Sequence, residues 1–257
     1  MTVLSCGACR EPPVADGTPA PASVSVGAPS APLLASEIEA SGLRVRSGSI
    51  ARSSLWGFSD LGIDLSRVRL EVVSAKRGAL LPDLLPAGAL AIVNGGYFEA
   101  DFKPSTWLKS GGTELSPRRA ARNGGVLAVA ATRHYVGALA GLAFEPELAV
   151  QSFPLIVEPG GRPGIHRDDG RRAARTVACV VAGQLHFIII AAPRGDGPTL
   201  YEADALLRKP APDGFGCSAA LNLDGGPSSG VVFGPGVSAK QRVPVAPVAY
   251  GIALAPR

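Results

Sequence analysis

Ten short apolar runs of strand length set the class of fold that this chain can adopt. They occupy residues 43–46, 68–73, 89–93, 126–131, 155–157, 176–181, 185–190, 219–223, 230–233 and 248–254. Their length and composition are typical of β-strands. The clearest helix signal is Thr199-x-x-Glu202, a capping box that predicts a helix ending near Arg208. Because strands outnumber helices, the sequence predicts an α+β fold built on a strand-rich mixed or antiparallel sheet with few helices.

Two local patterns refine this prediction. The tetrapeptide Val181-Ala182-Gly183-Gln184 separates two of the runs. It predicts a tight hairpin turn, so the runs 176–181 and 185–190 are expected to be antiparallel neighbours. Within the predicted helix, the apolar residues recur at helical spacing and predict one buried stripe, formed by Leu200, Ala203, Leu206 and Leu207.

The first 32 residues differ from the rest of the chain. Prolines are interspersed there with small residues and follow no period, at positions 12, 13, 19, 21, 29 and 32. Such a segment buries too little apolar surface to offset its ordering entropy, which predicts a disordered tail or linker. The remaining residues, 33–257, are expected to form one domain, because strand-rich domains often reach this size undivided.

The beginning of the chain also resembles part of a targeting signal. Val3-Leu4-Ser5-Cys6 is similar to the end of a bacterial lipoprotein signal, with Cys6 as the residue that would be lipidated. An ordinary thiol in a mobile tail is the alternative, and both stay open. Cys6 and Cys9 also have CxxC spacing, but they lack the helix start of a redox motif and the second ligand pair of a zinc site.

Composition excludes two classes of partner. The net charge is only +4, aromatic residues make up 5% of the chain, and no lysine or arginine tract occurs. Nucleic-acid binding is therefore not expected. No apolar stretch approaches the roughly 20 residues of a membrane helix, so the only membrane association expected is through a lipid at Cys6.

Two glycine-rich strings follow predicted strands and are the best candidates for a ligand site. Asn94-Gly95-Gly96-Tyr97-Phe98 comes after the run 89–93, and Asn222-Leu223-Asp224-Gly225-Gly226-Pro227-Ser228-Ser229-Gly230 comes after the run 219–223. A polar side chain beside bare backbone lets a ligand approach the main chain closely. The two strings are therefore expected to be two walls of one pocket. A hairpin turn is the alternative for each, and Asn123-Gly124-Gly125 offers a second Asn-Gly turn.

The second string and an isolated arginine suggest the kind of ligand. Asp224, the following glycine amides and two serine hydroxyls together suit a polyhydroxylated or phosphorylated molecule. Arg175 precedes a buried strand, where its charge needs an anionic partner. That partner is either a phosphate or a nearby acid in a salt bridge. His134 and His186 have no metal-ligand spacing, and the charged loop 166–172 is typical of a solvated segment.

In combination, these motifs resemble the phosphodiester glycosidase family. In chain order they are Asn-Gly-Gly-x-Phe, Gln151-Ser152-Phe153-Pro154-Leu155, Ala174-Arg175-Thr176, Thr-Leu-x-Glu and Ala-Leu-Asn-Leu-Asp-Gly-Gly-Pro-Ser-Ser, spread over about residues 89–254. The family includes the enzyme that uncovers mannose 6-phosphate, and the chain is most similar to bacterial members described as exopolysaccharide-related. Pro227 and Cys179 depart from the family pattern, where glycine is common at both positions.

The resemblance implies hydrolysis of the bond between a sugar anomeric carbon and a phosphate oxygen, in an exported, periplasmic or cell-surface protein. Arg175 would bind the phosphate with amides around Gly95, Gly96, Gly225 and Gly226, and Asp224 would act at the anomeric carbon or on water. Sugar hydroxyls or phosphate oxygens would be bound by Asn94, Thr176, Asn222, Ser228 and Ser229. A second acid is expected, and Glu99 and Asp101 are the nearest to a motif.

Two other functions remain open: a non-catalytic carbohydrate-binding or surface-polymer scaffold, and a phosphodiesterase that cuts the phosphorus–oxygen bond. No cofactor is expected. Asp224 could hold a structural divalent cation, but the sequence shows no oxygen-ligand loop of the kind that binds calcium.

Cys179 and Cys217 permit either a disulfide or two buried thiols. The thiol form is the favoured expectation.

Overall fold

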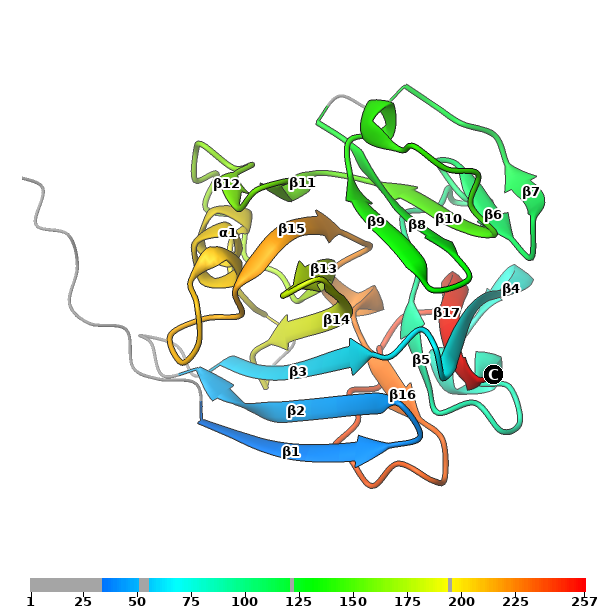
Figure 1. The fold of residues 1–257 in the computed structure, drawn as a ribbon, viewed down its shortest axis with the longest axis horizontal. Helices are drawn as coiled ribbons and strands as arrows, with labels where there is room; N and C mark the ends of the chain where they lie inside the picture. The colour runs from blue at the N-terminus through cyan, green and yellow to red at the C-terminus, as the bar shows by residue number, and fades with distance from the viewer. Residues whose placement is uncertain (1–33, 51–55, 121–122, 194–195) are drawn as a thin grey trace, which may run out of the picture.

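The computed structural model describes residues 34–50, 56–120, 123–193 and 196–257. The predicted tail 1–32 and the predicted lipidation site Cys6 lie outside these ranges. Three sheets make up most of the described chain (Figure 1). Their strands pair antiparallel throughout the described ranges, which confirms the strand-rich α+β prediction.

The largest sheet has eight strands in the order β1-β2-β3-β14-β13-β15-β11-β12. Their bounds are β1 (Leu34–Ala40), β2 (Leu43–Ile50), β3 (Trp56–Ile63), β11 (Leu155–Glu158), β12 (Arg162–Pro163), β13 (Arg175–Val181), β14 (Gln184–Ala191) and β15 (Cys217–Asn222). The first three strands form a meander whose strands pair along nearly their full length. This meander lies at one edge of the sheet, where the sequence predicted only the run 43–46.

Two smaller sheets complete the described fold. A five-stranded sheet has the order β7-β6-β10-β8-β9, and a four-stranded sheet has the order β16-β5-β17-β4. The first contains β6 (Leu108–Ser110), β7 (Thr113–Ser116), β8 (Gly125–Ala130), β9 (Arg133–Gly137) and β10 (Leu148–Ser152). The second contains β4 (Val68–Ala79), β5 (Ala91–Asn94), β16 (Val231–Phe233) and β17 (Val248–Pro256). Three 3₁₀ turns are η1 (Leu81–Leu84), η2 (Leu139–Gly141) and η3 (Gly226–Ser228).

Alternation along the strands divides the core into layers. On β14, Leu185, Phe187 and Ile189 belong to the main core cluster, which also contains residues of the two smaller sheets. Ile188 and Ile190 point to the other face, into a second cluster. Successive side chains of a strand point to opposite faces, so β14, a central strand of the large sheet, is buried on both sides.

The second cluster is covered by α1 (Leu200–Arg208), the one α-helix in the described ranges. The predicted capping box is present, because the Thr199 side chain accepts from the Glu202 amide and the Glu202 carboxylate accepts from the Thr199 amide. The buried stripe is formed as predicted by Ala203, Leu206 and Leu207. Leu200 is partly buried against the same cluster.

The predicted hairpin between β13 and β14 is also confirmed. Val181 pairs with Gln184, and the two turn residues have positive φ, 47° at Ala182 and 79° at Gly183. Positive φ at both central residues is the backbone of a type I′ turn, whose twist matches that of the flanking strands.

The favoured expectation for the two central cysteines was wrong. Cys179 on β13 and Cys217 on β15 form a disulfide, with their Cα atoms 5.8 Å apart. Their strands are neighbours in the large sheet, which brings the two side chains within bonding reach. No helix in the described ranges is long and apolar enough to cross a membrane.

Candidate functional site

Asn94 stands at the end of β5 and connects the two predicted strings. Its side-chain Oδ1 accepts from the Thr176 hydroxyl (2.7 Å) and from the Gly230 amide (3.1 Å). Its Nδ2 donates to the carbonyls of Asp224 (2.8 Å) and Gly95 (3.1 Å). The side chain is fully buried, and its hydrogen-bonding capacity is used inside the protein. Asn94 and Thr176 therefore hold the strings together.

Neither string forms the hairpin that was its alternative interpretation. After Asn94 the chain leaves the four-stranded sheet and next forms β6 in the five-stranded sheet. After Asn222 it leaves the large sheet, and β16 pairs with β5 in the four-stranded sheet. The Asp224 amide donates to the Gly95 carbonyl (3.1 Å). Both strings thus connect one sheet to another, and the two strings contact each other. The prediction that they form two walls of one pocket requires this contact.

The two glycines after Asn94 make room for Tyr250 of β17. A Cβ at Gly95 would lie 2.1 Å from the Tyr250 ring, so any larger residue would displace it. The Gly96 amide donates to the Tyr250 hydroxyl (2.9 Å), and the Gly95 amide donates to the Tyr250 carbonyl (3.0 Å). These amides therefore hold the local fold in the structure.

The amides of the second glycine pair are also engaged within the protein. The Gly225 amide donates to Oδ1 of Asp224 (2.8 Å), and the Gly226 amide donates to the Ala174 carbonyl (2.8 Å). The sequence-based expectation that these glycine amides and those of the first string cradle a phosphate is therefore not supported by the geometry. The donors left for an anion belong to side chains.

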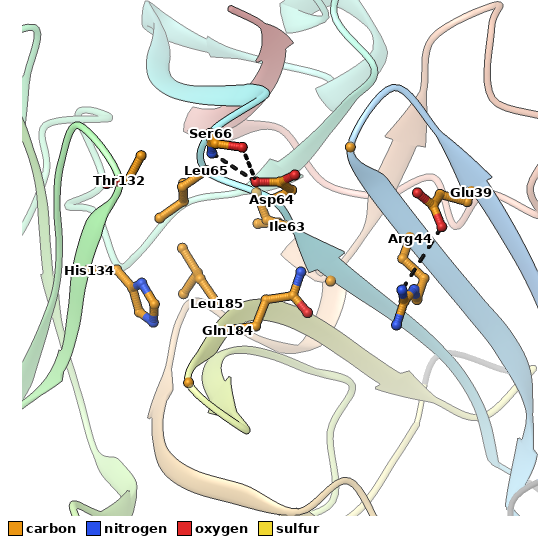
Figure 2. Close-up of a pocket in the computed structure, with 13 residues that line it drawn as sticks. Glu39, Arg44, Ile63, Asp64, Leu65, Ser66, Thr132, His134, Gln184 and Leu185 are labelled. Atoms are coloured by element: carbon orange, nitrogen blue, oxygen red, sulfur yellow. Dashed lines mark hydrogen bonds and ion pairs between the residues drawn. The ribbon is translucent and has the colours of Figure 1, made fainter.

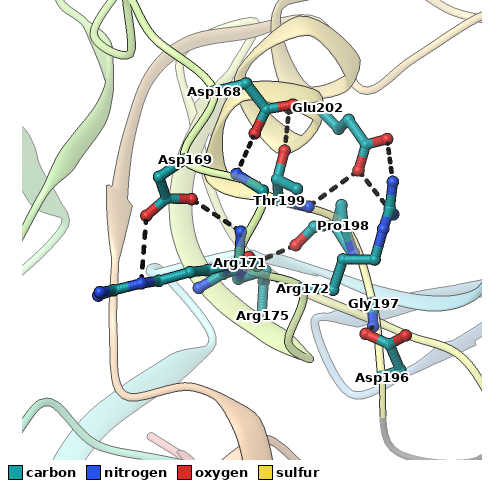
Figure 3. Close-up of polar contacts among 11 residues, drawn as sticks. Asp168, Asp169, Arg171, Arg172, Arg175, Asp196, Gly197, Pro198, Thr199 and Glu202 are labelled. Carbon is teal, nitrogen blue, oxygen red and sulfur yellow. Dashed lines mark hydrogen bonds and ion pairs between the residues drawn. The ribbon is translucent and has the colours of Figure 1, made fainter.

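Arg175 is the main cationic donor at this junction. Its side chain is buried, with Nε donating to the Pro198 carbonyl (3.1 Å) and Nη2 to the Arg171 carbonyl (2.8 Å), as Figure 3 shows. No carboxylate of the described residues lies within 4.0 Å of it. The salt-bridge alternative is therefore wrong for the described chain. Since a guanidinium has five N–H donors, three remain for a ligand.

The loop before Arg175 pairs with the start of α1 (Figure 3). Arg172 forms two hydrogen bonds with the Glu202 carboxylate, at 2.9 and 2.8 Å. Asp168 and Asp169 accept from backbone amides within the loop. Consequently the acids of this loop are satisfied locally, and the carbonyl of Arg171 is fixed where it positions the Arg175 guanidinium.

Asp224 lies two positions after the end of β15. Burial raises the pKa of its carboxyl above the ordinary value, while hydrogen bonds from Ser228 and from the Gly225 amide oppose that shift. No ion pair joins Asp224 to Arg175. The site therefore presents a carboxylate of raised basicity and a separate guanidinium.

The pKa of the Tyr97 phenol is affected by the charges of both Asp224 and Arg175. Burial raises this pKa, the Asp224 charge raises it further, and the Arg175 charge lowers it. The Tyr97 ring stacks on Phe153, with the centroids 4.5 Å apart. The hydroxyl oxygen accepts from Nδ2 of Asn222 (2.8 Å). Because that bond uses the oxygen, the phenolic proton is left to donate to a ligand.

Unpaired polar atoms gather at the same junction. Four buried side-chain polar atoms of the described residues lack a hydrogen-bond partner, and three of them lie here: Ser152 Oγ, Asn222 Oδ1 and Ser229 Oγ. The fourth, Arg242 Nε, lies on the separate segment 240–243. Asn222 and Ser229 belong to the second string, and Ser152 Oγ lies 3.5 Å from where a Cβ of Gly96 would be. Buried polar groups are rarely left unpaired, so this concentration points to a polar ligand.

The predicted site residues are thus brought together, except Glu99 and Asp101, the two candidates for the second acid. Glu99 and Asp101 line another cavity of about 560 Å³, where Asp101 is paired with Lys103 at 2.6 Å. Figure 2 shows a third region, a cavity of about 340 Å³ between Asp64, His134 and Gln184. Neither cavity is lined by Asn94, Arg175 or Asp224. Among the described residues, no group of three or more His, Cys, Asp or Glu side chains is placed to hold a metal.

The sequence analysis assigned no role to two residues of this site, Tyr97 and Tyr250. Tyr97 stands inside the first string, where a hydroxyl next to two glycines was available as a signal. Tyr250 lies in the middle of an apolar strand, and nothing near it in the sequence indicates that its hydroxyl meets Gly96, 154 positions away.

With this geometry in place, comparisons with known proteins become informative. A family profile described as phosphodiester glycosidase matches residues 87–255. No curated protein matches the sequence.

The solved structures that are similar to this chain include the following three. The catalytic domain of zebrafish N-acetylglucosamine-1-phosphodiester alpha-N-acetylglucosaminidase, auto-inhibited by its pro-peptide, is 14% identical (TM-score 0.62; 88% of this chain and 82% of that chain). A hypothetical protein from Synechocystis is 16% identical (TM-score 0.60; 87% and 64%), so this chain spans about 64% of its length. A protein of Burkholderia pseudomallei K96243, inferred to be exported, is 14% identical (TM-score 0.57; 79% and 75%). At these identities the likeness shows a shared fold.

Proposed function

The chain belongs to the phosphodiester glycosidase family, and we propose that it hydrolyses the bond between a sugar anomeric carbon and a phosphodiester oxygen. The observation that carries this proposal is Arg175. Its buried guanidinium has three N–H donors to spare and no carboxylate partner among the described residues. It stands at the junction that also presents the Asp224 carboxylate and the Tyr97 hydroxyl.

Arg175 binds the phosphate in this proposal. A guanidinium fork matches two phosphate oxygens and forms charge-assisted hydrogen bonds. When the glycosidic bond breaks, its electron pair moves to the phosphate oxygen, which leaves as a phosphate monoester. The added charge strengthens the bonds from Arg175 in the transition state, and this difference accelerates the reaction. Since a phosphate is already a good leaving group, the reaction depends less on a strong general acid.

Asp224 acts on the sugar side. The transition state of glycoside hydrolysis is oxocarbenium-like, so an ionised carboxylate stabilises it or accepts the proton of the attacking water. The oxygen of that water ends on the anomeric carbon. Tyr97 donates its free hydroxyl proton in a hydrogen bond to a phosphate oxygen. Asn222 Oδ1, Ser228 and Ser229 offer polar atoms to sugar hydroxyls, and Asn94 and Thr176 position the loop that carries Asp224.

We also propose that the protein acts outside the cytoplasm, on cell-surface or exopolysaccharide material. The disulfide between Cys179 and Cys217 supports this location, because such bonds persist in oxidising compartments. The similarity to a protein inferred to be exported agrees with it. Anchoring through Cys6 stays a prediction from the sequence.

Turnover of a chromogenic sugar phosphodiester tests the proposal. Arg175→Gln should lower kcat/KM by about 100-fold or more, the usual cost of losing one preorganised donor to developing charge. Arg162→Gln is the matched control, because it removes one positive charge from an exposed ion pair with Glu158. Circular dichroism confirms that both variants are folded. Equal activity of the Arg175 variant and the control would contradict the assignment.

Two further readouts separate the alternatives. In isotopically labelled water, label should enter the sugar; label in the phosphate would indicate cleavage of the phosphorus–oxygen bond instead. Tight binding of the phosphodiester by wild-type protein with no turnover would favour the non-catalytic carbohydrate-binding scaffold.

A further inference from the structure

A cavity lies along the meander at the edge of the large sheet. It has a volume of about 940 Å³. Four hydroxyl side chains line it, Ser36, Ser47, Ser49 and Ser59, together with the segment 240–243 near the C-terminus. Ser47 is the cross-strand partner of both Ser36 and Ser59, so three of the hydroxyls form a row across β1, β2 and β3. We call this cavity the serine groove.

Arg242 is an unpaired cation in the serine groove. Its Nε is buried without a hydrogen-bond partner, and the guanidinium forms no ion pair or hydrogen bond with the described residues. Burial lowers the pKa of Arg242, but a guanidinium stays charged in proteins. Burying a charge without a partner is unfavourable. A bound anion would offset the desolvation of the Arg242 guanidinium.

The remaining lining is partly apolar, with Phe58, Ile189 and Val243 among its residues, and its polar members favour an anion. Lys240 adds a second cation, Gln241 and the serine hydroxyls add donors, and no carboxylate lines the groove. Donors and cations without a competing acid are what phosphate oxygens require. A neutral sugar could also bond to the hydroxyls, which accept as well as donate, but it would leave both charges uncompensated.

The serine groove shares a wall with the candidate site. Arg242 exchanges two backbone hydrogen bonds with Val231, at 2.8 and 3.0 Å, and the Val245 amide donates to the Pro227 carbonyl at 3.1 Å. A Cβ at Gly230 would lie 2.4 Å from the Arg242 carbonyl oxygen. The groove segment thus lies directly on the loop that carries Asp224. Because Val231 is seven positions after Asp224, the Cα atoms of these two residues lie at most about 25 Å apart.

We infer that the serine groove binds a second phosphate of the substrate, which makes the substrate a polymer of sugar-phosphate units and not a single sugar phosphodiester. This inference rests on the proposed glycosidase function for the identity of the polymer. In such a chain every unit repeats the anion that Arg175 binds, so one molecule can occupy both positions. Arg242 and Lys240 then add affinity for the polymer without taking part in bond cleavage.

The test uses two probes and the full chain. Short-chain inorganic polyphosphate, which has repeated anions but no sugar, reports on the groove by calorimetry. A monomeric chromogenic sugar phosphodiester reports on the catalytic site. Arg242→Gln should weaken polyphosphate binding about tenfold or more, the cost of losing charge-assisted hydrogen bonds, and should leave kcat/KM for the monomer unchanged. Arg69→Gln, which removes an exposed charge paired with Glu71 on β4, should leave both unchanged.

The outcomes separate this inference from the proposed function. Polyphosphate binding that depends on Arg242, in a protein that never hydrolyses the monomer, would leave the anion site standing while the glycosidase proposal fails. Wild-type affinity in the Arg242→Gln variant would overturn the anion site, and so would an equal loss in Arg69→Gln. Lys240→Gln provides a second variant at an exposed position, in case Arg242→Gln does not fold.

Discussion

Replacement of Asn94 by alanine decides whether this residue holds the site together or contacts substrate. The change strands the buried hydroxyl of Thr176, the buried amide of Gly230 and the carbonyl of Asp224. The Gly95 carbonyl keeps a partner, the Asp224 amide at 3.1 Å. Each stranded buried group costs about 1–3 kcal/mol, so we expect the free energy of unfolding to fall by at least about 3 kcal/mol.

Urea unfolding followed by circular dichroism measures this loss. It should be a large part of a total stability of about 5–15 kcal/mol, typical of a domain. Asn123→Gly is the control, because Asn123 is exposed, forms no described side-chain bond and has a φ of 58° that glycine adopts freely. The control should unfold near the wild-type midpoint. An Asn94→Ala variant with wild-type stability but no activity would refute the argument and return Asn94 to the substrate-binding role expected from the sequence.

Two further predictions concern the reactive groups. Burial raises the pKa of Asp224, so kcat/KM should fall with decreasing pH through a pKa above the ordinary aspartate range. The same shift means that the fold favours the protonated acid; this contribution to stability is present below the unfolded-state pKa and lost as pH rises through the folded pKa. Asp224→Asn should therefore unfold at higher urea than wild type at neutral pH, an advantage that vanishes near pH ~3; an advantage independent of pH would contradict the assignment. Tyr97→Phe keeps the ring stacked on Phe153 and leaves Asn222 Nδ2 two other acceptors. It should change the unfolding free energy by about 1 kcal/mol or less while lowering kcat/KM about tenfold or more, and unchanged turnover would remove the hydroxyl from the reaction.

Local features of this fold could be predicted from the sequence because their causes are local. The capping box at Thr199 needs only residues three apart, and the turn at Ala182 and Gly183 needs only two residues that accept positive φ. Each of the ten predicted runs overlaps a strand for the same reason: a buried strand has a composition that a short window reveals.

The partners of these elements could not be predicted in the same way. Asn94 bonds residues 82, 130 and 136 positions away, and the Asn-Gly pair beside it is locally indistinguishable from a hairpin turn. The tertiary structure overrides that local preference by sending β5 and β15 to different sheets. The meander of β1 and β3 was missed because serine and glycine interrupt its apolar alternation, and those small residues are the ones that line the serine groove.

The cystine joins the two strands that carry Arg175 and Asn222, at positions four and five residues from them. A preparation made in a reducing cytoplasm would carry two thiols there instead, and only hydrogen bonds would then hold these strands in register. Recombinant material should accordingly be directed to an oxidising compartment, or reoxidised, before its catalytic competence is judged.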